Sequence, residues 1–114
     1  MTDRRRKLLH DALTAAAVAE SFVAGQTLAA YSADAMRRLA VERLLEILGE
    51  ACSRLAREDA AFIVEVPGAR LAVGLRNRII HGYDAVDDET VYWTVIDDLP
   101  ALRSALQTRL DALQ

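Results

Sequence analysis

Five side chains that can do chemistry fall within eight residues, in the segment RNRIIHGY at positions 76 to 83. They are Arg76, Asn77, Arg78, His81 and Tyr83. A histidine can act as a general acid or base, and an arginine presents a planar fork of donors to a phosphate. Such a pair can cleave RNA without a metal: the histidine accepts the 2'-hydroxyl proton, that oxygen attacks phosphorus, and the arginine stabilises the growing charge. The segment is therefore a candidate site for acid–base chemistry on a phosphate.

The same segment also fits an ordinary helix end. Gly82 is a helix stop signal, and cationic side chains in a last turn are favoured by about 0.3–1 kcal/mol because the free carbonyls there carry partial negative charge. Spacing alone favours this second interpretation over a site.

The helical period constrains which of these side chains can meet. Residues four apart share a face, so Asn77 and His81 should be neighbours. Arg76 and His81 are five apart and point about 140° away from each other in a regular helix. The two can therefore cooperate only if the chain loosens near Gly82, or if they meet their counterparts across a two-fold axis.

Acidic residues elsewhere supply one supporting candidate. Glu50 lies beside Ala51 and Cys52 in an apolar helical pattern, where an unpaired carboxylate would be costly. We expect it either to orient Arg76 or Arg78, or to lie on a solvated edge of its helix. The acidic run at positions 87 to 89 resembles a metal cluster, but it stands where a helix should begin, so capping is the interpretation we favour. No zinc signature occurs, and we expect no metal or cofactor in this protein.

Apolar periodicity and Gly or Pro punctuation predict the elements that must position these residues. The predicted fold is an all-α, single-domain antiparallel bundle of about five helices over residues 1–114. The expected helices cover residues 3–24, 34–58, 67–82, 89–99 and 99–113. The segment REDAAFIVEVPGAR between the second and third helices is expected to form a loop, although AFIVEV could pass for a short strand.

The second helix has an apolar arc wider than a surface helix requires, as a central or dimer-forming helix would. One stripe comprises Met36, Ala40, Leu44, Ile47, Ala51 and Leu55, and an adjoining one Leu45, Leu48 and Cys52. In the third helix, Leu71, Leu75 and Ile79 should face inward. The only tryptophan, Trp93, should be core packing rather than a base-stacking group.

Composition limits the class of protein. The net charge of −3 leaves no general basic footprint for nucleic acid, so any RNA contact must be local. No run approaches the length of a membrane span, and the lone Cys52 cannot form an internal disulfide. We therefore expect a soluble, cytoplasmic protein with a buried structural thiol.

Three blocks of the sequence resemble the HepT-like branch of the HEPN superfamily. The family motif is an arginine, four to six residues, a histidine and often a tyrosine two places later, matched here by Arg76, His81 and Tyr83. The segment AVERLLEILGEACSRL resembles the family's long helix with its Gly-Glu-Ala step, and VYWTVIDDLPALRSAL resembles its C-terminal part. The resemblance covers most of the chain from about Met36 to Leu106.

That resemblance implies a five-helix domain that dimerises, so that arginines and histidines of both subunits line one cleft. It implies a metal-independent endoribonuclease, the toxin of a type II toxin–antitoxin pair, acting on RNA. Its partner would be a nucleotidyltransferase antitoxin of the MntA type that uses ATP to transfer AMP to Tyr83. Charge and bulk added there would block the site. Arg76, His81 and Asn77 would be catalytic, with Arg78 and Glu50 in support.

Two other functions remain open on the sequence. The chain could be a non-catalytic HEPN module that binds a nucleotide or RNA in the same cleft. It could also be a structural partner of a nucleotidyltransferase, in which the motif only stabilises a dimer.

Overall fold

The computed structural model describes residues 2–82 and 86–113, and every regular element within them is helical. The helices are α1 (Thr2–Val23), α2 (Leu28–Ala33), α3 (Ala35–Glu58), α4 (Ala61–Glu65), α5 (Ala69–Ile80), α6 (Asp88–Trp93), the π-helical turn η1 (Thr94–Asp98) and α7 (Leu99–Ala112). The all-α prediction is confirmed. The five predicted helices are present, and α2 and α4 add two short ones.

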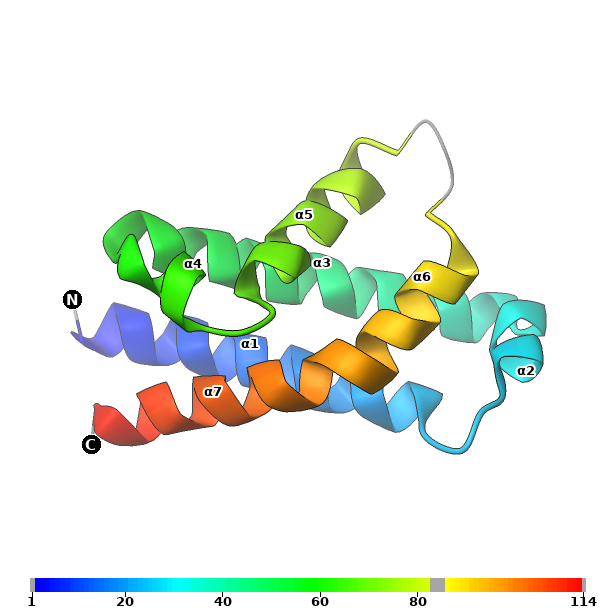
Figure 1. Cartoon of the computed structure of the whole chain (residues 1–114), viewed down its shortest axis with the longest axis horizontal. Coiled ribbons are helices and arrows are strands. Elements are labelled where there is room, and N and C mark those ends of the chain that lie inside the picture. The colour runs from blue at the N-terminus through cyan, green and yellow to red at the C-terminus, as the bar shows by residue number, and fades with distance from the viewer. Residues whose placement is uncertain (1, 83–85, 114) are drawn as a thin grey trace.

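Three long helices form the body of the bundle (Figure 1). Helix α1 packs against both α3 and α7 and runs antiparallel to them, so the two ends of the chain lie at the same end of the molecule. Helix α5 packs on α3 and crosses it obliquely. At this crossing Arg76 lies against Gly49 of α3, while the last turn of α5 rises away from α3 (Figure 1).

Alanine makes close packing along α1 possible. Four of its alanines are buried: Ala12, Ala15, Ala16 and Ala19. Leucines of α3 and α7 complete the core, and Leu48 and Leu106 are fully buried. Full burial of a leucine side chain stabilises a fold by about 1.5–3 kcal/mol. The core thus combines small residues at helix contacts with large ones in the spaces between them.

The buried face of α3 differs in part from the predicted stripe. The side chains of Val41, Leu45 and Leu48 are buried, whereas Met36 is 83% exposed. The prediction that Met36 belongs to the core is wrong because the first turn of α3 is anchored by Arg37. The Arg37 side chain donates to the carbonyl of Phe22 at 2.6 Å, which turns the neighbouring Met36 outward.

The segment after α3 forms a helical turn rather than a loop or strand. Asp59 accepts a hydrogen bond from the backbone N–H of Ala61 at 3.1 Å and so starts α4. Phe62 of this turn is buried, and the Arg109 guanidinium lies 5.4 Å from its ring centroid. A cation over an aromatic face is attractive, so α4 is held against α7 by tertiary contact rather than by helix propensity.

Helix α5 begins at Ala69, two residues after the predicted start at Pro67, because Gly68 adopts a φ of +85°. Leu75 is buried and Ile79 partly buried, as predicted, but Leu71 is 43% exposed. Ala69 and Ala72 occupy the buried positions instead. Small residues line this face because α5 approaches α3 closely.

In the C-terminal third of the chain, α6, the π-helical turn η1 and α7 follow one another without a break. Asp87 caps α6 by accepting hydrogen bonds from the backbone N–H and hydroxyl of Thr90, so the capping interpretation is confirmed for Asp87. Trp93 is 45% exposed, which contradicts its predicted burial; Tyr92 takes the core position and donates to the carbonyl of Gln26 at 2.6 Å. The π-helical turn η1 follows these two residues and shifts the register between α6 and α7.

Cys52 is fully buried, and desolvation raises the pKa of its thiol to about 12. The interpretation as a structural thiol is confirmed. No helix in the described part of the chain is long and apolar enough to cross a membrane.

Candidate active site at the crossing of α3 and α5

The last turn of α5 remains regular up to its end. Its C-cap is His81, whose backbone N–H donates to the carbonyl of Asn77 at 3.0 Å. Both Asn77 and His81 are exposed and lie one turn apart, as the helical period predicts. Within the described residues, the loosening near Gly82 that would bring His81 to Arg76 is therefore not observed.

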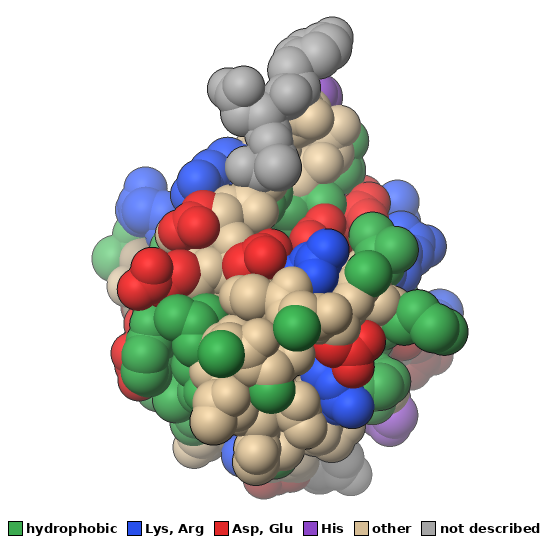
Figure 2. Space-filling view, turned by 90° about the vertical axis from the view of Figure 1, so that its right-hand side faces the viewer, with side chains coloured by type: hydrophobic (Ala, Val, Ile, Leu, Met, Phe, Trp, Pro, Cys, Tyr) green, Lys and Arg blue, Asp and Glu red, His purple; other side chains and the backbone are tan. Residues whose placement is uncertain are grey.

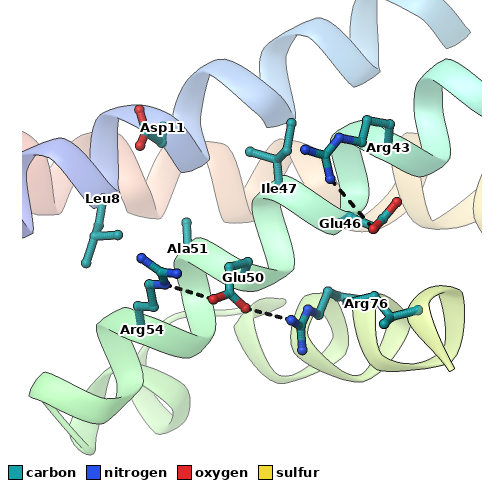
Figure 3. Close-up of a pocket in the computed structure, with 10 residues that line it drawn as sticks. Leu8, Asp11, Arg43, Glu46, Ile47, Glu50, Ala51, Arg54 and Arg76 are labelled. Atoms are coloured by element: carbon teal, nitrogen blue, oxygen red, sulfur yellow. Dashed lines mark hydrogen bonds and ion pairs between the residues drawn. The ribbon is translucent and has the colours of Figure 1, made fainter.

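Arg76 points away from His81 and toward α3. Its side chain is 25% exposed, and its Nη2 lies 2.8 Å from Oε1 of Glu50 (Figure 3). Its Nη1 donates to Oδ1 of Asn77 at 3.0 Å. The contact with Asn77 was not expected from residue spacing, but the arginine side chain is long enough to reach its sequence neighbour. Glu50 and Asn77 thus fix the guanidinium in one orientation.

Glu50 joins two arginines. Its Oε2 accepts a hydrogen bond from Nε of Arg54 at 2.8 Å, on the side opposite Arg76. The hydrogen bond from Arg54 is the largest effect lowering the pKa of Glu50, and the charge of Arg76 lowers it further against a desolvation penalty. Glu50 is therefore an anion at neutral pH, and the three side chains together carry one net positive charge.

The other candidate residues take different places. Arg78 is exposed, and within residues 2–82 and 86–113 it has no ion pair or side-chain hydrogen bond. Glu50 therefore orients Arg76 and not Arg78, which decides between the alternatives that the sequence left open. The His81 ring likewise makes no hydrogen bond to another described residue. Tyr83 lies outside the described residues.

A hollow of about 310 Å³ opens beside Arg76, between α1, α3 and α5. Its charged lining comes from Asp11, Arg43, Glu46, Glu50, Arg54 and Arg76, and its apolar lining from Leu8, Ile47, Ala51 and Ile80. Arg43 and Glu46 are paired at 3.7 Å on the rim. The hollow has room for part of a substrate or of a second protein chain.

Charge is distributed unevenly around the site. Acidic side chains gather on the end of the molecule formed by α2 and α6 (Figure 2), where Arg38 lies 3.6 Å from Asp88. Within the described residues, no group of His, Cys, Asp and Glu side chains could hold a metal ion.

Sequence reasoning overlooked Arg54. The spacing of Glu50 and Arg54 is four residues with the acid first, which is the favourable order for an ion pair on a helix. That signal was available and identifies Arg54 as the second partner of Glu50.

Comparison with known proteins bears directly on this arrangement. The family model described as ribonuclease HepT-like matches residues 12–109. The chain belongs to the ribonuclease HepT-like family. The resemblance inferred from Arg76, His81 and the long helix is thereby confirmed.

Curated relatives carry related names. The protein named "Probable ribonuclease HepT" of Thermococcus cleftensis is 28% identical over 107 residues, which cover 94% of this chain and 96% of that protein. Two proteins of Methanocaldococcus jannaschii, each named "Putative RNase", are 30% identical over 68% of this chain and 66% of theirs, and 35% identical over 63% and 65%. No solved structure matches the chain significantly.

Proposed function

We propose that this HepT-like protein is a metal-independent endoribonuclease, the toxin of a toxin–antitoxin pair. The observation that carries the proposal is the fixed guanidinium of Arg76, which Glu50 and Asn77 hold five residues before the exposed His81. The names of the family and of its relatives support an activity on RNA.

In the proposed reaction, the 2'-oxygen of a ribose attacks the adjacent phosphate of the RNA chain. His81 accepts the proton of the 2'-hydroxyl, the 2'-oxygen bonds to phosphorus, and the bond from phosphorus to the 5'-oxygen breaks. The departing 5'-oxygen takes up a proton, which leaves a 2',3'-cyclic phosphate and a 5'-hydroxyl. Arg76 stabilises the negative charge that develops on the phosphoryl oxygens.

Arg76 keeps donors free for this role. A guanidinium has five N–H donors, and two contacts, to Glu50 and Asn77, hold it in place. The donors that remain on its two terminal nitrogens can bind a phosphate. Arg54 offsets the negative charge of Glu50, which would otherwise repel that phosphate. A fixed donor with low reorganisation cost is what transition-state stabilisation requires.

Assembly as a homodimer is part of the proposal. Within one chain Arg76 faces α3, and His81 is exposed at the helix end. The two residues are not in contact, so a second copy that brings its own pair alongside would complete the site. The dimer prediction rests on this separation and on the family resemblance.

Regulation is proposed to act through Tyr83, which follows His81 by two residues. A nucleotidyltransferase antitoxin would transfer AMP from ATP to the Tyr83 oxygen, which loses its proton as pyrophosphate leaves. The added phosphate would then compete with RNA for Arg76 and His81 by charge and by occupancy.

The test is an RNA cleavage assay with excess EDTA that compares wild type with His81→Ala. Wild type should cleave and leave cyclic phosphate ends, and His81→Ala should cleave at least about 100-fold more slowly, since general acid–base catalysis contributes about 10²–10⁴-fold. His10→Ala is the matched control, because His10 is also exposed but lies on α1.

Two outcomes would contradict the proposal. Equal cleavage by His81→Ala and wild type would remove His81 from the reaction. RNA binding without cleavage by wild type would instead support a non-catalytic binding module.

A further inference from the structure

Helix α3 contains a glycine in its interior, at Gly49, where helix propensity would favour almost any other residue. Gly49 is buried and its φ is not positive, so no unusual backbone conformation explains it. Its explanation must be the close approach of another part of the chain.

The part of the chain that approaches Gly49 is α5, through its backbone and the first side-chain atoms of Arg76. A Cβ atom built on Gly49 would lie 2.2 Å from Cβ of Arg76, 2.9 Å from Cγ of Arg76 and 2.7 Å from the carbonyl oxygen of Ala72. All three distances are far inside van der Waals contact, and two of the three atoms cannot move without the backbone of α5. Any side chain at position 49 therefore forces α5 away from α3.

Two consecutive residues of α3 thus act on the same side chain. Gly49 leaves room for Cβ and Cγ of Arg76. Glu50 holds the other end of the same side chain, where its Oε1 lies 2.8 Å from Nη2 of the guanidinium. The guanidinium Nε between them is buried. We propose that Gly49 is a positioning residue, whose missing side chain sets the α3–α5 distance at which Arg76 meets Glu50.

The consequence for the site follows from geometry. If α5 moves outward by about 1 Å, the guanidinium loses its register with Glu50, and misplacement of that size can lower a rate by about 100-fold. This consequence for catalysis rests on the proposed function. The placement of Arg76 by Gly49 does not, and it can be measured without RNA.

The first measurement is hydrogen exchange of the Nε proton of Arg76 by NMR, with the signal assigned from its loss in Arg76→Lys. In the wild type, this buried proton should exchange at least about tenfold more slowly than that of the exposed Arg78. In Gly49→Ala, the Nε proton of Arg76 should exchange nearly as fast as that of Arg78, and its chemical shift should change.

Gly74→Ala is the matched control. Gly74 lies in α5 only two residues before Arg76, but a Cβ there would meet nothing within 4 Å. This variant should leave the Arg76 signal unchanged. A folded Gly49→Ala variant that also leaves the signal unchanged would overturn the proposal.

A double variant covers the case in which Gly49→Ala does not fold. Two of its three clashes are with the Arg76 side chain, so Arg76→Gly should relieve these two and leave only the clash with the carbonyl oxygen of Ala72. In urea unfolding, Gly49→Ala should therefore be less destabilising in the Arg76→Gly background than in the wild type. An equal loss in both backgrounds would show that Gly49 does not act through Arg76.

The cleavage assay then tests the catalytic consequence. Gly49→Ala should lower kcat by about 10- to 100-fold with KM within threefold, and Gly74→Ala should stay within twofold of wild type in both. Unchanged kcat in a folded Gly49→Ala variant would overturn the catalytic role. If wild type does not cleave RNA, the proposed function fails, while the exchange measurement still decides the role of Gly49.

Discussion

At the scale of single residues, the site depends on a chain of charges rather than on isolated groups. Arg54, Glu50 and Arg76 alternate in sign, and each contact in the series is 2.8 Å long. The carboxylate serves as a fixed anchor because both neighbours favour its ionised form. A change in its charge should therefore alter both stability and the placement of Arg76.

Glu50→Gln tests this through the pH dependence of stability. The pKa of Glu50 is lowered from its ordinary value of 4.5 in the folded protein, so its stabilising effect is fully present above that value and is lost as the pH falls through the folded pKa. Urea unfolding should show Glu50→Gln to be less stable than wild type at pH 7, with the difference shrinking below about pH 4.5.

Glu46→Gln provides the comparison one turn earlier on α3. Glu46 is paired with Arg43, at 3.7 Å, and Arg43 is 69% exposed. Exposed pairs of this kind contribute little. The variant should follow wild type across the pH range. A Glu50→Gln variant that does the same would show that the network of Arg54, Glu50 and Arg76 adds no more to stability than a surface pair.

At the scale of elements, end caps and close crossings place the helices. Asp87 caps α6 through Thr90, and Asp34 caps α3 through the backbone N–H of Arg37 at 3.0 Å. Helix α6 is only six residues long and cannot be stable alone, so its cap and its packing determine whether it forms.

Asp87→Ala should destabilise the protein by about 1 kcal/mol, the usual effect of removing an N-cap side chain. Thermal unfolding followed by circular dichroism measures this loss. Glu89→Ala, in the first turn of the same helix but without the capping bonds, should have a smaller effect. Equal effects of the two substitutions would indicate that helix-dipole charge, not capping, stabilises α6.

At the scale of the whole molecule, α1, α3 and α7 form the body of the bundle, and α5 and α6 lie on it. Cys52 lies fully buried in that body. Because burial raises the pKa of its thiol to about 12, the thiolate is scarce in the folded state at any physiological pH. The thiol of Cys52 can therefore react with a reagent only when the bundle of α1, α3 and α7 opens.

A thiol reagent should accordingly label native protein only at the rate of global unfolding. Labelling should accelerate several-thousandfold in denaturing urea, because folded proteins of this size open rarely. A Cys52→Ala/Ser104→Cys variant supplies the control, since Ser104 is exposed on α7 and should react at once. Fast labelling of native Cys52 would reveal local opening of α3.

The sequence by itself determined much of this protein. Helical periodicity and the Gly, Pro and Asp signals located the main helices, because these features act within a few residues of chain. Local spacing also set Asn77 and His81 on one face at a helix end, and the motif from Arg76 to Tyr83 indicated the family.

Only the tertiary structure decided which groups meet. It turned Met36 and Leu71 outward and paired Glu50 with Arg76 rather than with Arg78. Periodicity defines the buried face of a helix only to within about one residue, and the partner of a long side chain depends on the distance between helices. Here that distance is set by the contact of Gly49 with α5, which joins residues far apart in the sequence.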